Sequence, residues 1–177
     1  MAEVTAIKIT AKGYKVTYTE NGDMKTLVSE QKPKEEFVGA LVLTGKILCN
    51  HLQLNDQEKY ISCTGLETRI NKDGKAEYKV YANMSRPSWD KLKLKLNTGF
   101  MQEVEDPELF ESEDSGKYPY LLSEGEVEIL ENMLERAADY LEGERVVEEP
   151  DLPGIDGDYD DEQQQDSYEE PSFIKGW

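Results

Sequence analysis

Aromatic and basic side chains are interleaved through residues 1–100 of the chain. Cationic groups neutralise phosphates, and aromatic rings stack on bases, each stacked base contributing about 1–3 kcal/mol. The residue types are therefore those that could hold a single-stranded polyanion. The aromatic members are Tyr14, Tyr18, Tyr60, Tyr78, Tyr81 and Trp89; the basic members are Lys12, Lys15, Lys59, Arg69, Lys72, Lys75, Lys79, Arg86, Lys91, Lys93 and Lys95. The strand-holding set predicted from them is Lys15, Tyr18, Lys79, Tyr81, Trp89, Lys91, Lys93 and Lys95.

The charge of the chain is divided unevenly between its two halves. Its 177 residues carry a formal net charge of −18, which taken alone argues against nucleic acid. Residues 1–100, however, hold 16 Lys and Arg against 12 Asp and Glu, a net of +4. Residues 101–177 hold 4 against 26, a net of −22. Such asymmetry between halves points to an acidic region competing with, or replacing, a polyanion.

A purely structural interpretation of the same residues carries about equal weight. Strand tyrosines commonly serve the core, and a lysine stripe on an edge strand protects it from edge-to-edge pairing. That protection explains the stripe Lys91, Lys93, Lys95 but not the wider basic excess.

Catalytic and metal-binding patterns are weak. The chain has one His, and Cys49 and His51 would point about 200° apart on a helix, which is poor for a nucleophile and its base. The spacing of a calcium loop is present in Asp158, Asp160, Glu162 and Glu169, but Gln163 replaces the glycine that its sharp turn needs. We therefore predict a protein that is not an enzyme and uses no metal or other cofactor.

Alternating residues predict antiparallel strands. Ile7 and Ile9, and then the segment from Tyr14 to Tyr18, alternate with polar residues, and Asn21-Gly22 suits a type I′ turn. These signals together predict a three-stranded meander that ends near Ser29. Residues 58–84 are predicted to form a hairpin with its turn at 71–74 and a bulge at Gly65. We predict a further strand over residues 91–96, with the side chains of Leu92, Leu94 and Leu96 pointing inward. Residues 97–121 are predicted to form a long loop.

Two helices should cover this sheet. Apolar residues recur at steps of three and four over residues 34–52, where Gly39 and Gly45 would be explained by close packing against the sheet. Ser123 and Glu126 form a capping box that opens a second helix over 123–142. The predicted fold is α+β: a mainly antiparallel sheet and two helices in a domain at 1–145.

Residues 146–177 predict an acidic tail. They carry 11 acids and one lysine, so they cannot bury enough apolar surface to offset their conformational entropy, and we expect disorder. The tail ends in an apolar tip whose Phe173, Ile174 and Trp177 are typical of a peptide that a partner protein captures.

This order of features resembles two known groups. A basic β-rich body followed by a long acidic tail with an aromatic end resembles bacteriophage single-stranded DNA-binding proteins. Three strands, a helix and two strands resemble an OB-fold. The segments 32–41 and 137–145 are similar to small phage early-region proteins that accompany recombination genes.

The resemblance implies a non-catalytic single-stranded DNA-binding protein that assists replication or recombination and recruits partners through its tail. The alternative is an acidic phage inhibitor, with DNA-mimicking character, that binds a host nuclease or immune complex. A structural role in the virion, in which homo-oligomers would be expected, is a third and less favoured class. No apolar run approaches the ~18 residues of a membrane span, and no secretion signal opens the chain, so a cytoplasmic protein of the host cell is expected.

Overall fold

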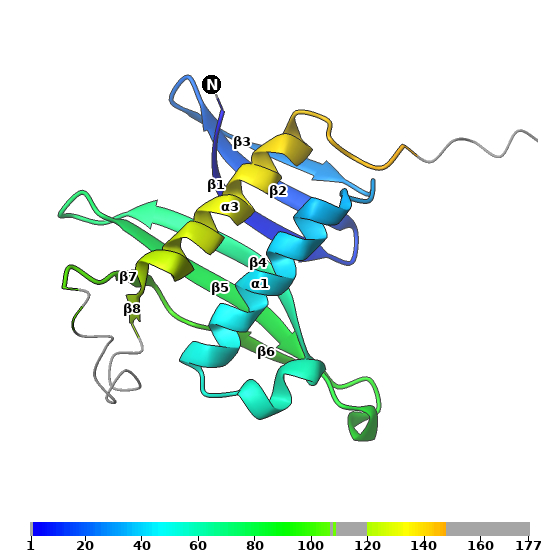
Figure 1. Ribbon diagram of the computed structural model, residues 1–177. Helices are drawn as coiled ribbons and strands as arrows, with labels where there is room; N and C mark the ends of the chain where they lie inside the picture. The colour runs from blue at the N-terminus through cyan, green and yellow to red at the C-terminus, as the bar shows by residue number, and fades with distance from the viewer. Residues whose placement is uncertain (1, 107, 109–119, 148–177) are drawn as a thin grey trace, which may run out of the picture. The chain divides into compact units, whose positions relative to one another are not determined.

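The computed structural model describes residues 2–106, 108 and 120–147, and it contains one eight-stranded, mostly antiparallel sheet with two long helices (Figure 1). Along the sheet the strands follow the order β3-β2-β1-β4-β5-β7-β8, and β6 also pairs with β5. The strands are β1 (Glu3–Thr10), β2 (Gly13–Glu20), β3 (Asp23–Ser29), β4 (Ile61–Ile70), β5 (Ala76–Met84), β6 (Leu94–Asn97), β7 (Met101–Glu103) and β8 (Leu121–Leu122). The α+β class predicted from the sequence is confirmed.

The meander and the hairpin form where the alternation places them. Asn21 and Gly22 both have positive φ, as a type I′ turn requires, and the turn joins β2 to β3. The register between β4 and β5 shifts between Cys63 and Gly65, which confirms the bulge at that glycine. The first arm of the hairpin, predicted from Tyr60 to Ile70, begins one residue later, because residues 55–60 form a 3-10 helix, η1 (Asn55–Tyr60).

Both predicted helices are present and lie side by side across one face of the sheet (Figure 1). They are α1 (Glu35–His51) and α3 (Glu124–Leu141). At the start of α3 the Ser123 hydroxyl accepts from the Glu126 backbone N–H, and the Glu126 carboxylate accepts from the Ser123 N–H at 3.0 Å, which completes the predicted capping box. Among the described residues no helix is both long and apolar enough to cross a membrane.

The core lies between the two helices and this face of the sheet. Tyr14, Phe37 and Tyr140 form an aromatic cluster with ring centroids 5.6–5.9 Å apart, and it joins β2, α1 and α3. Tyr140 is fully buried, and its hydroxyl donates to the Gln31 carbonyl at 2.6 Å. The fully buried side chains that the strands contribute are Ile7, Val16, Leu66, Val80, Met101 and Leu122.

The segment 91–96 differs from its predicted form. Asp90 and Lys91 have left-handed backbone angles, so pairing starts only at Leu94, in β6. Leu92 and Leu94 are 65% and 49% exposed, and only Leu96 packs against the core. The expectation of an inward side chain is wrong for Leu92, because the chain is not yet in the ladder there. Leu94 is opposite the buried Met84 and so lies on the helix-covered face, but it stays half exposed.

Residues 97–121 are not wholly a loop. They contain β7 and the start of β8, which pair with each other in parallel, and β7 also pairs with β5. Both strands are too short to produce a period in the sequence.

The sheet also departs from an OB barrel, because β3 pairs only with β2 within the described part and the sheet stays open.

The chain divides into a compact unit, Met1–Val146, and a second unit, Val147–Trp177. The predicted disordered tail and its tip residues Phe173, Ile174 and Trp177 lie outside the described residues, apart from the first two positions of the tail.

Candidate nucleic-acid interface

The face of the sheet opposite the two helices carries the candidate site, and we call it the open face. In Figure 1 the helices lie in front of the sheet, so the open face points away from the viewer. Strand alternation places on it the neighbours of the buried core residues: Lys8 follows Ile7, Lys15 precedes Val16, and Tyr81 follows Val80.

Residues from six strands form one continuous row across the open face. Lys15 is paired with Val28 of β3 and with Lys8 of β1, which is paired in turn with Gly65 of β4. Gly65 is opposite Tyr81 of β5, and Tyr81 is opposite Asn97 of β6. Two lysines and one aromatic ring are thus held on a rigid framework rather than on loops.

Gly65 is required at the centre of this row. A Cβ built on Gly65 would lie 2.4 Å from the Ile7 carbonyl oxygen and 3.3 Å from the Lys8 Cγ, so no larger residue fits without a backbone shift. The absence of a side chain leaves Lys8 free to reach across to β5, where its Nζ lies 5.2 Å from the centroid of the Tyr81 ring. The bulge at this glycine therefore shapes the site as well as the strand.

Tyr81 is the centre of the charged arrangement. Lys79 Nζ also lies 5.2 Å from its ring centroid, so two ammonium groups flank one aromatic ring. The Tyr81 hydroxyl donates to Glu67 at 2.7 Å. Burial, followed by this hydrogen bond and the negative charge of Glu67, raises the pKa of Tyr81 to about 12. The phenol stays neutral at physiological pH and is fixed in orientation.

A second aromatic ring lies beside this group. The Arg69 guanidinium carbon is 3.6 Å from the centroid of the Phe100 ring, and Lys79 Nζ is 5.4 Å from it. Glu77 accepts from Arg69 Nε at 2.7 Å and so holds the guanidinium in place. Lys79 therefore contacts both rings, and Tyr81 and Phe100 form one aromatic and cationic surface.

Cations exceed acids on the open face. Among the described strand residues and Phe100's neighbours, five basic side chains lie there, and two of the three acids, Glu67 and Glu77, are engaged with Tyr81 and Arg69. The third acid, Glu3, lies at the far end of β1. The basic side chains are Lys8, Lys15, Arg69, Lys79 and Lys95.

The structure brings together only part of the predicted set. Lys15, Lys79, Tyr81 and Lys95 share the open face. Tyr18 is opposite the buried Val4 and packs against the core, so it lies on the helix-covered face instead.

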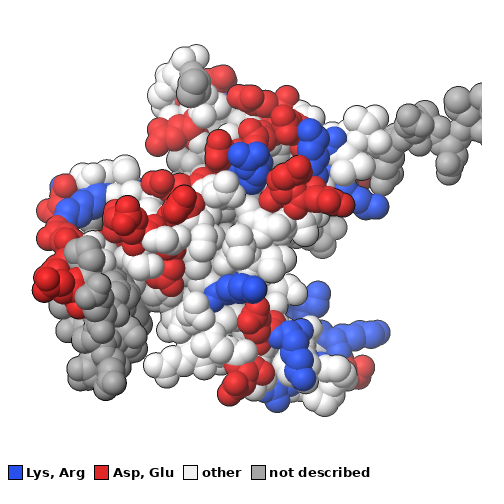
Figure 2. All heavy atoms as spheres, viewed as in Figure 1, with Lys and Arg blue, Asp and Glu red and all other residues white. Residues whose placement is uncertain are grey.

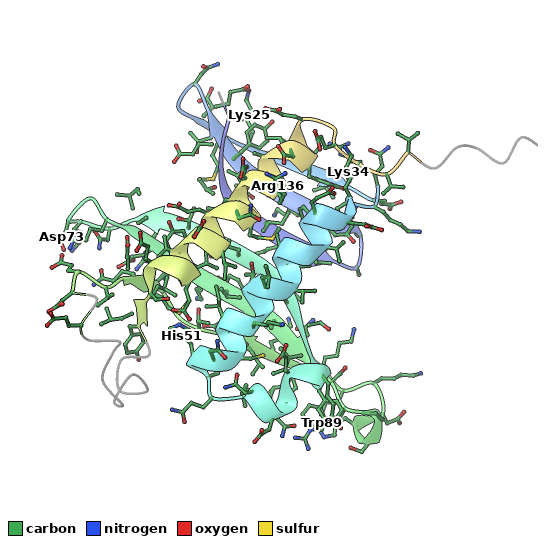
Figure 3. The ribbon with its side chains drawn as sticks, in the orientation of Figure 1. Lys25, Lys34, His51, Asp73, Trp89 and Arg136 are labelled. Carbon is green, nitrogen blue, oxygen red and sulfur yellow. The ribbon has the colours of Figure 1, made fainter. Side chains whose placement is uncertain are left out.

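Trp89, Lys91 and Lys93 lie in the segment between β5 and β6, outside the ladder. Figure 3 labels Trp89 there, in the 3-10 helix η2 (Pro87–Trp89). Arg86 has its guanidinium carbon 5.4 Å from the Tyr60 ring centroid and 5.6 Å from the Trp89 ring centroid. These residues form a second, smaller basic and aromatic group at the end of the sheet.

Sequence reasoning missed Lys8 and Phe100. Lys8 had a usable signal, because it alternates with Ile7 and Ile9 in a strand that was itself predicted. Phe100 had none, because it lies in a segment without detectable period and reaches the open face only through the pairing of β7 with β5.

The helix-covered face has a different electrostatic character (Figure 2). Asp and Glu gather over α3, whereas Lys and Arg gather near η1 and the η2 segment. The acids on α3 that are exposed are Glu124, Glu128, Glu131 and Glu135.

The remaining candidate for chemistry is inert. Cys49 is 1% exposed, and burial, together with the charge of Glu58, raises the pKa of its thiol. His51 contacts Glu126 on α3 rather than serving as its base. No group of three or more His, Cys, Asp or Glu in the described ranges is arranged to hold a metal ion.

Comparison with known proteins gave no match to a family model, to a curated protein or to a solved structure.

Proposed function

We propose that the protein binds single-stranded nucleic acid, with single-stranded DNA as the expected ligand, on the open face of its sheet. The observation that carries the proposal is the group around Tyr81, where two lysines flank one ring and Lys79 links it to Phe100. Base stacking on such rings, with phosphates on the surrounding cations, is the usual mode of sequence-tolerant single-strand binding.

The chemistry assigned to each residue follows from its position. Tyr81 and Phe100 supply aromatic rings for stacking, and Lys8 and Lys79 turn from the Tyr81 ring to phosphates when a base takes their place. Lys8, Lys15 and Lys79 are exposed or half-buried at the same surface and neutralise phosphates. Glu67 and Glu77 orient the Tyr81 hydroxyl and the Arg69 guanidinium, which reduces the ordering entropy that binding costs. No step in this function breaks a covalent bond, so the proposed role is binding in replication or recombination rather than catalysis.

Fluorescence anisotropy with a labelled oligothymidylate of about 16 nucleotides at ~50 mM salt tests the proposal. The informative variant is Lys8→Ala with Lys79→Ala, and the matched control is Lys34→Ala with Lys46→Ala, which removes the same charge from α1 and the residue before it. We expect the first pair to weaken binding at least tenfold and the second pair to change it little.

Two results would contradict the proposal. The first is no binding at ~50 mM salt, even after removal of residues 148–177. The second is an equal loss of binding in both double variants, which would mean that general electrostatics rather than the open face holds the strand.

The acidic surface of α3 supports a second candidate, an inhibitor that binds a nucleic-acid-binding host protein. Exposed glutamates recur along α3 at steps of three and four residues. At a rise of about 1.5 Å per residue, successive glutamates are spaced about 4.5–6 Å along the helix axis. Recovery of one host protein in a pull-down, insensitive to nuclease and lost when Glu128 and Glu135 are changed to Lys, would favour this candidate over the first.

A further inference from the structure

Strand β3 is a long and regular edge of the described sheet. It pairs only with β2 in the part of the chain that the structure describes. Natural edges are protected by shortness, proline, bulges or charged side chains, lysine above all. β3 has seven residues and no proline, its register with β2 has no shift, and its one lysine, Lys25, is paired with Glu20. At the opposite end β8 has only two residues, so that edge is already short.

The outward backbone groups of β3 can be assigned from its turn. The type I′ turn at Asn21-Gly22 closes on the pair Glu20 and Asp23, which is hydrogen-bonded in such hairpins. Hydrogen-bonded and non-hydrogen-bonded pairs then alternate along the ladder. The N–H and C=O groups of Met24, Thr26 and Val28 therefore point away from β2.

We infer that β3 pairs with β3 of a second copy of this chain, antiparallel, about a two-fold axis at Thr26. This register places Thr26 opposite Thr26 and Met24 opposite Val28, so all three outward residues gain hydrogen-bonded partners. Met24 and Val28 are 76% and 55% exposed, and each would cover the other's apolar surface twice in the dimer.

The charges of β3 are compatible with self-pairing. In the same register Lys25 is opposite Leu27 and Asp23 is opposite Ser29, so no like charges face each other directly. The alternative occupant to consider for this edge is the chain's own segment after Val147. We reject it because Glu148, Glu149 and Pro150 are poor strand formers. A second copy fits the edge better.

The dimer would extend the open face. An antiparallel pair of identical edge strands is related by a two-fold axis perpendicular to the sheet, so both open faces point the same way. Lys15 and Val28 of each copy would then lie near the centre of one wider surface. The inference rests on the edge geometry and not on nucleic-acid binding, so either can fail alone.

A cysteine at the axis tests the register. Thr26→Cys in the full chain would place one thiol on each side of the axis. The two Cα atoms at this position would be about 5.5 Å apart, a separation that a disulfide can span. Thr17→Cys is the matched control, because Thr17 is paired with Thr26 one strand further in. Two Thr17 positions would be about 15 Å apart, beyond the reach of a disulfide. The native Cys49 and Cys63 are buried in both variants.

We expect mild oxidation to convert most of the Thr26→Cys protein, and little of the control, to a covalent dimer. Light scattering of the unmodified full chain should give twice the 20.2 kDa of one chain. Thr26→Pro removes an outward N–H and should give the single-chain mass with an unchanged circular dichroism spectrum. A single-chain mass for the unmodified protein at micromolar concentration, or equal cross-linking of the two cysteine variants, would overturn the inference.

Discussion

The Nε2 atom of His51 lies 3.1 Å from Oε1 of Glu126, and this contact joins the last residue of α1 to the first turn of α3. Both side chains are largely buried, at 9% and 20% exposure. Figure 3 labels His51 at the end of α1. Glu126 also accepts from Ser123, so one carboxylate both caps α3 and connects the two helices that cover the sheet.

This carboxylate makes the stability of the protein depend on acid pH. Burial raises the pKa of Glu126, but hydrogen bonds from His51 and Ser123 outweigh it, and the pKa is lowered from 4.5. A lowered folded-state pKa contributes stability above the unfolded value, and this is lost as pH falls through the folded value. The free energy of unfolding should therefore drop below pH 4.5.

Glu126→Gln keeps a capping-box residue and removes the charge. At pH 7 we expect it to lower the free energy of unfolding by about 1.5–3 kcal/mol, and to show less loss below pH 4.5 than the unmodified protein. Urea unfolding at a series of pH values measures both effects. Glu128→Gln, exposed on the same helix, is the control, and an equal pH dependence in all three proteins would contradict the prediction.

Tyr81 should titrate at high pH because it is partly buried and its hydroxyl is bound to Glu67. Burial, and then the hydrogen bond and charge of Glu67, raise its pKa to about 12. Glu67→Gln should lower this pKa without returning it to the ordinary 10.0, since burial remains. Ultraviolet absorbance during a pH titration, with Tyr81→Phe subtracted and circular dichroism as a check on folding, measures it. An unchanged pKa in Glu67→Gln would mean that burial acts alone.

The two glycines of α1 should respond differently to alanine. A Cβ on Gly39 meets nothing within 4 Å, whereas one on Gly45 would lie 3.2 Å from the Cys63 Cβ. The explanation by close packing is therefore confirmed for Gly45 and wrong for Gly39. Gly39→Ala should raise the free energy of unfolding by about 1 kcal/mol through helix propensity. Gly45→Ala gains the same propensity but overpacks the contact with β4, so thermal unfolding should show no net stabilisation.

Tyr140 links α3 to the chain that leaves β3. Tyr140→Phe keeps the ring packed on Phe37 but removes the hydroxyl that donates to Gln31. We expect a loss of about 1 kcal/mol in the free energy of unfolding, measured by urea titration. Tyr120→Phe alters a tyrosine that is 63% exposed and should cost much less. Equal losses in the two variants would show that the hydrogen bond to Gln31 contributes little.

Local signals in the sequence predicted most of the fold. Asn21-Gly22 and the capping box at Ser123 act within a few residues, and alternation together with turn residues predicted β1 to β5. The failures have a different origin. β7 and β8 form only because distant segments pair. β6 begins later than predicted because Asp90 and Lys91 have left-handed backbone angles, and no glycine at these positions indicates this in the sequence.

The candidate site was predictable where alternation could be counted. Lys15 and Tyr18 are three residues apart in one strand, so period two already places them on opposite faces. The same counting would have added Lys8. The contact between Arg69 and Phe100 could not be predicted from alternation, because it depends on the pairing of β5 with β7.

Salt dependence should separate the cations of the open face from its rings. Each phosphate neutralised on a single strand contributes about −0.7 to the slope of log affinity against log salt. Lys8→Ala should make the slope shallower by about that amount, whereas Tyr81→Ala should weaken binding by about 1–3 kcal/mol and leave the slope nearly unchanged. Anisotropy titrations of the labelled oligothymidylate across a salt series measure both quantities, with Lys34→Ala as the control on the helix side. Lys8 Nζ lies against the Tyr81 ring, so a Lys8→Ala slope equal to that of the unmodified protein would assign this lysine to positioning the ring instead of to phosphate.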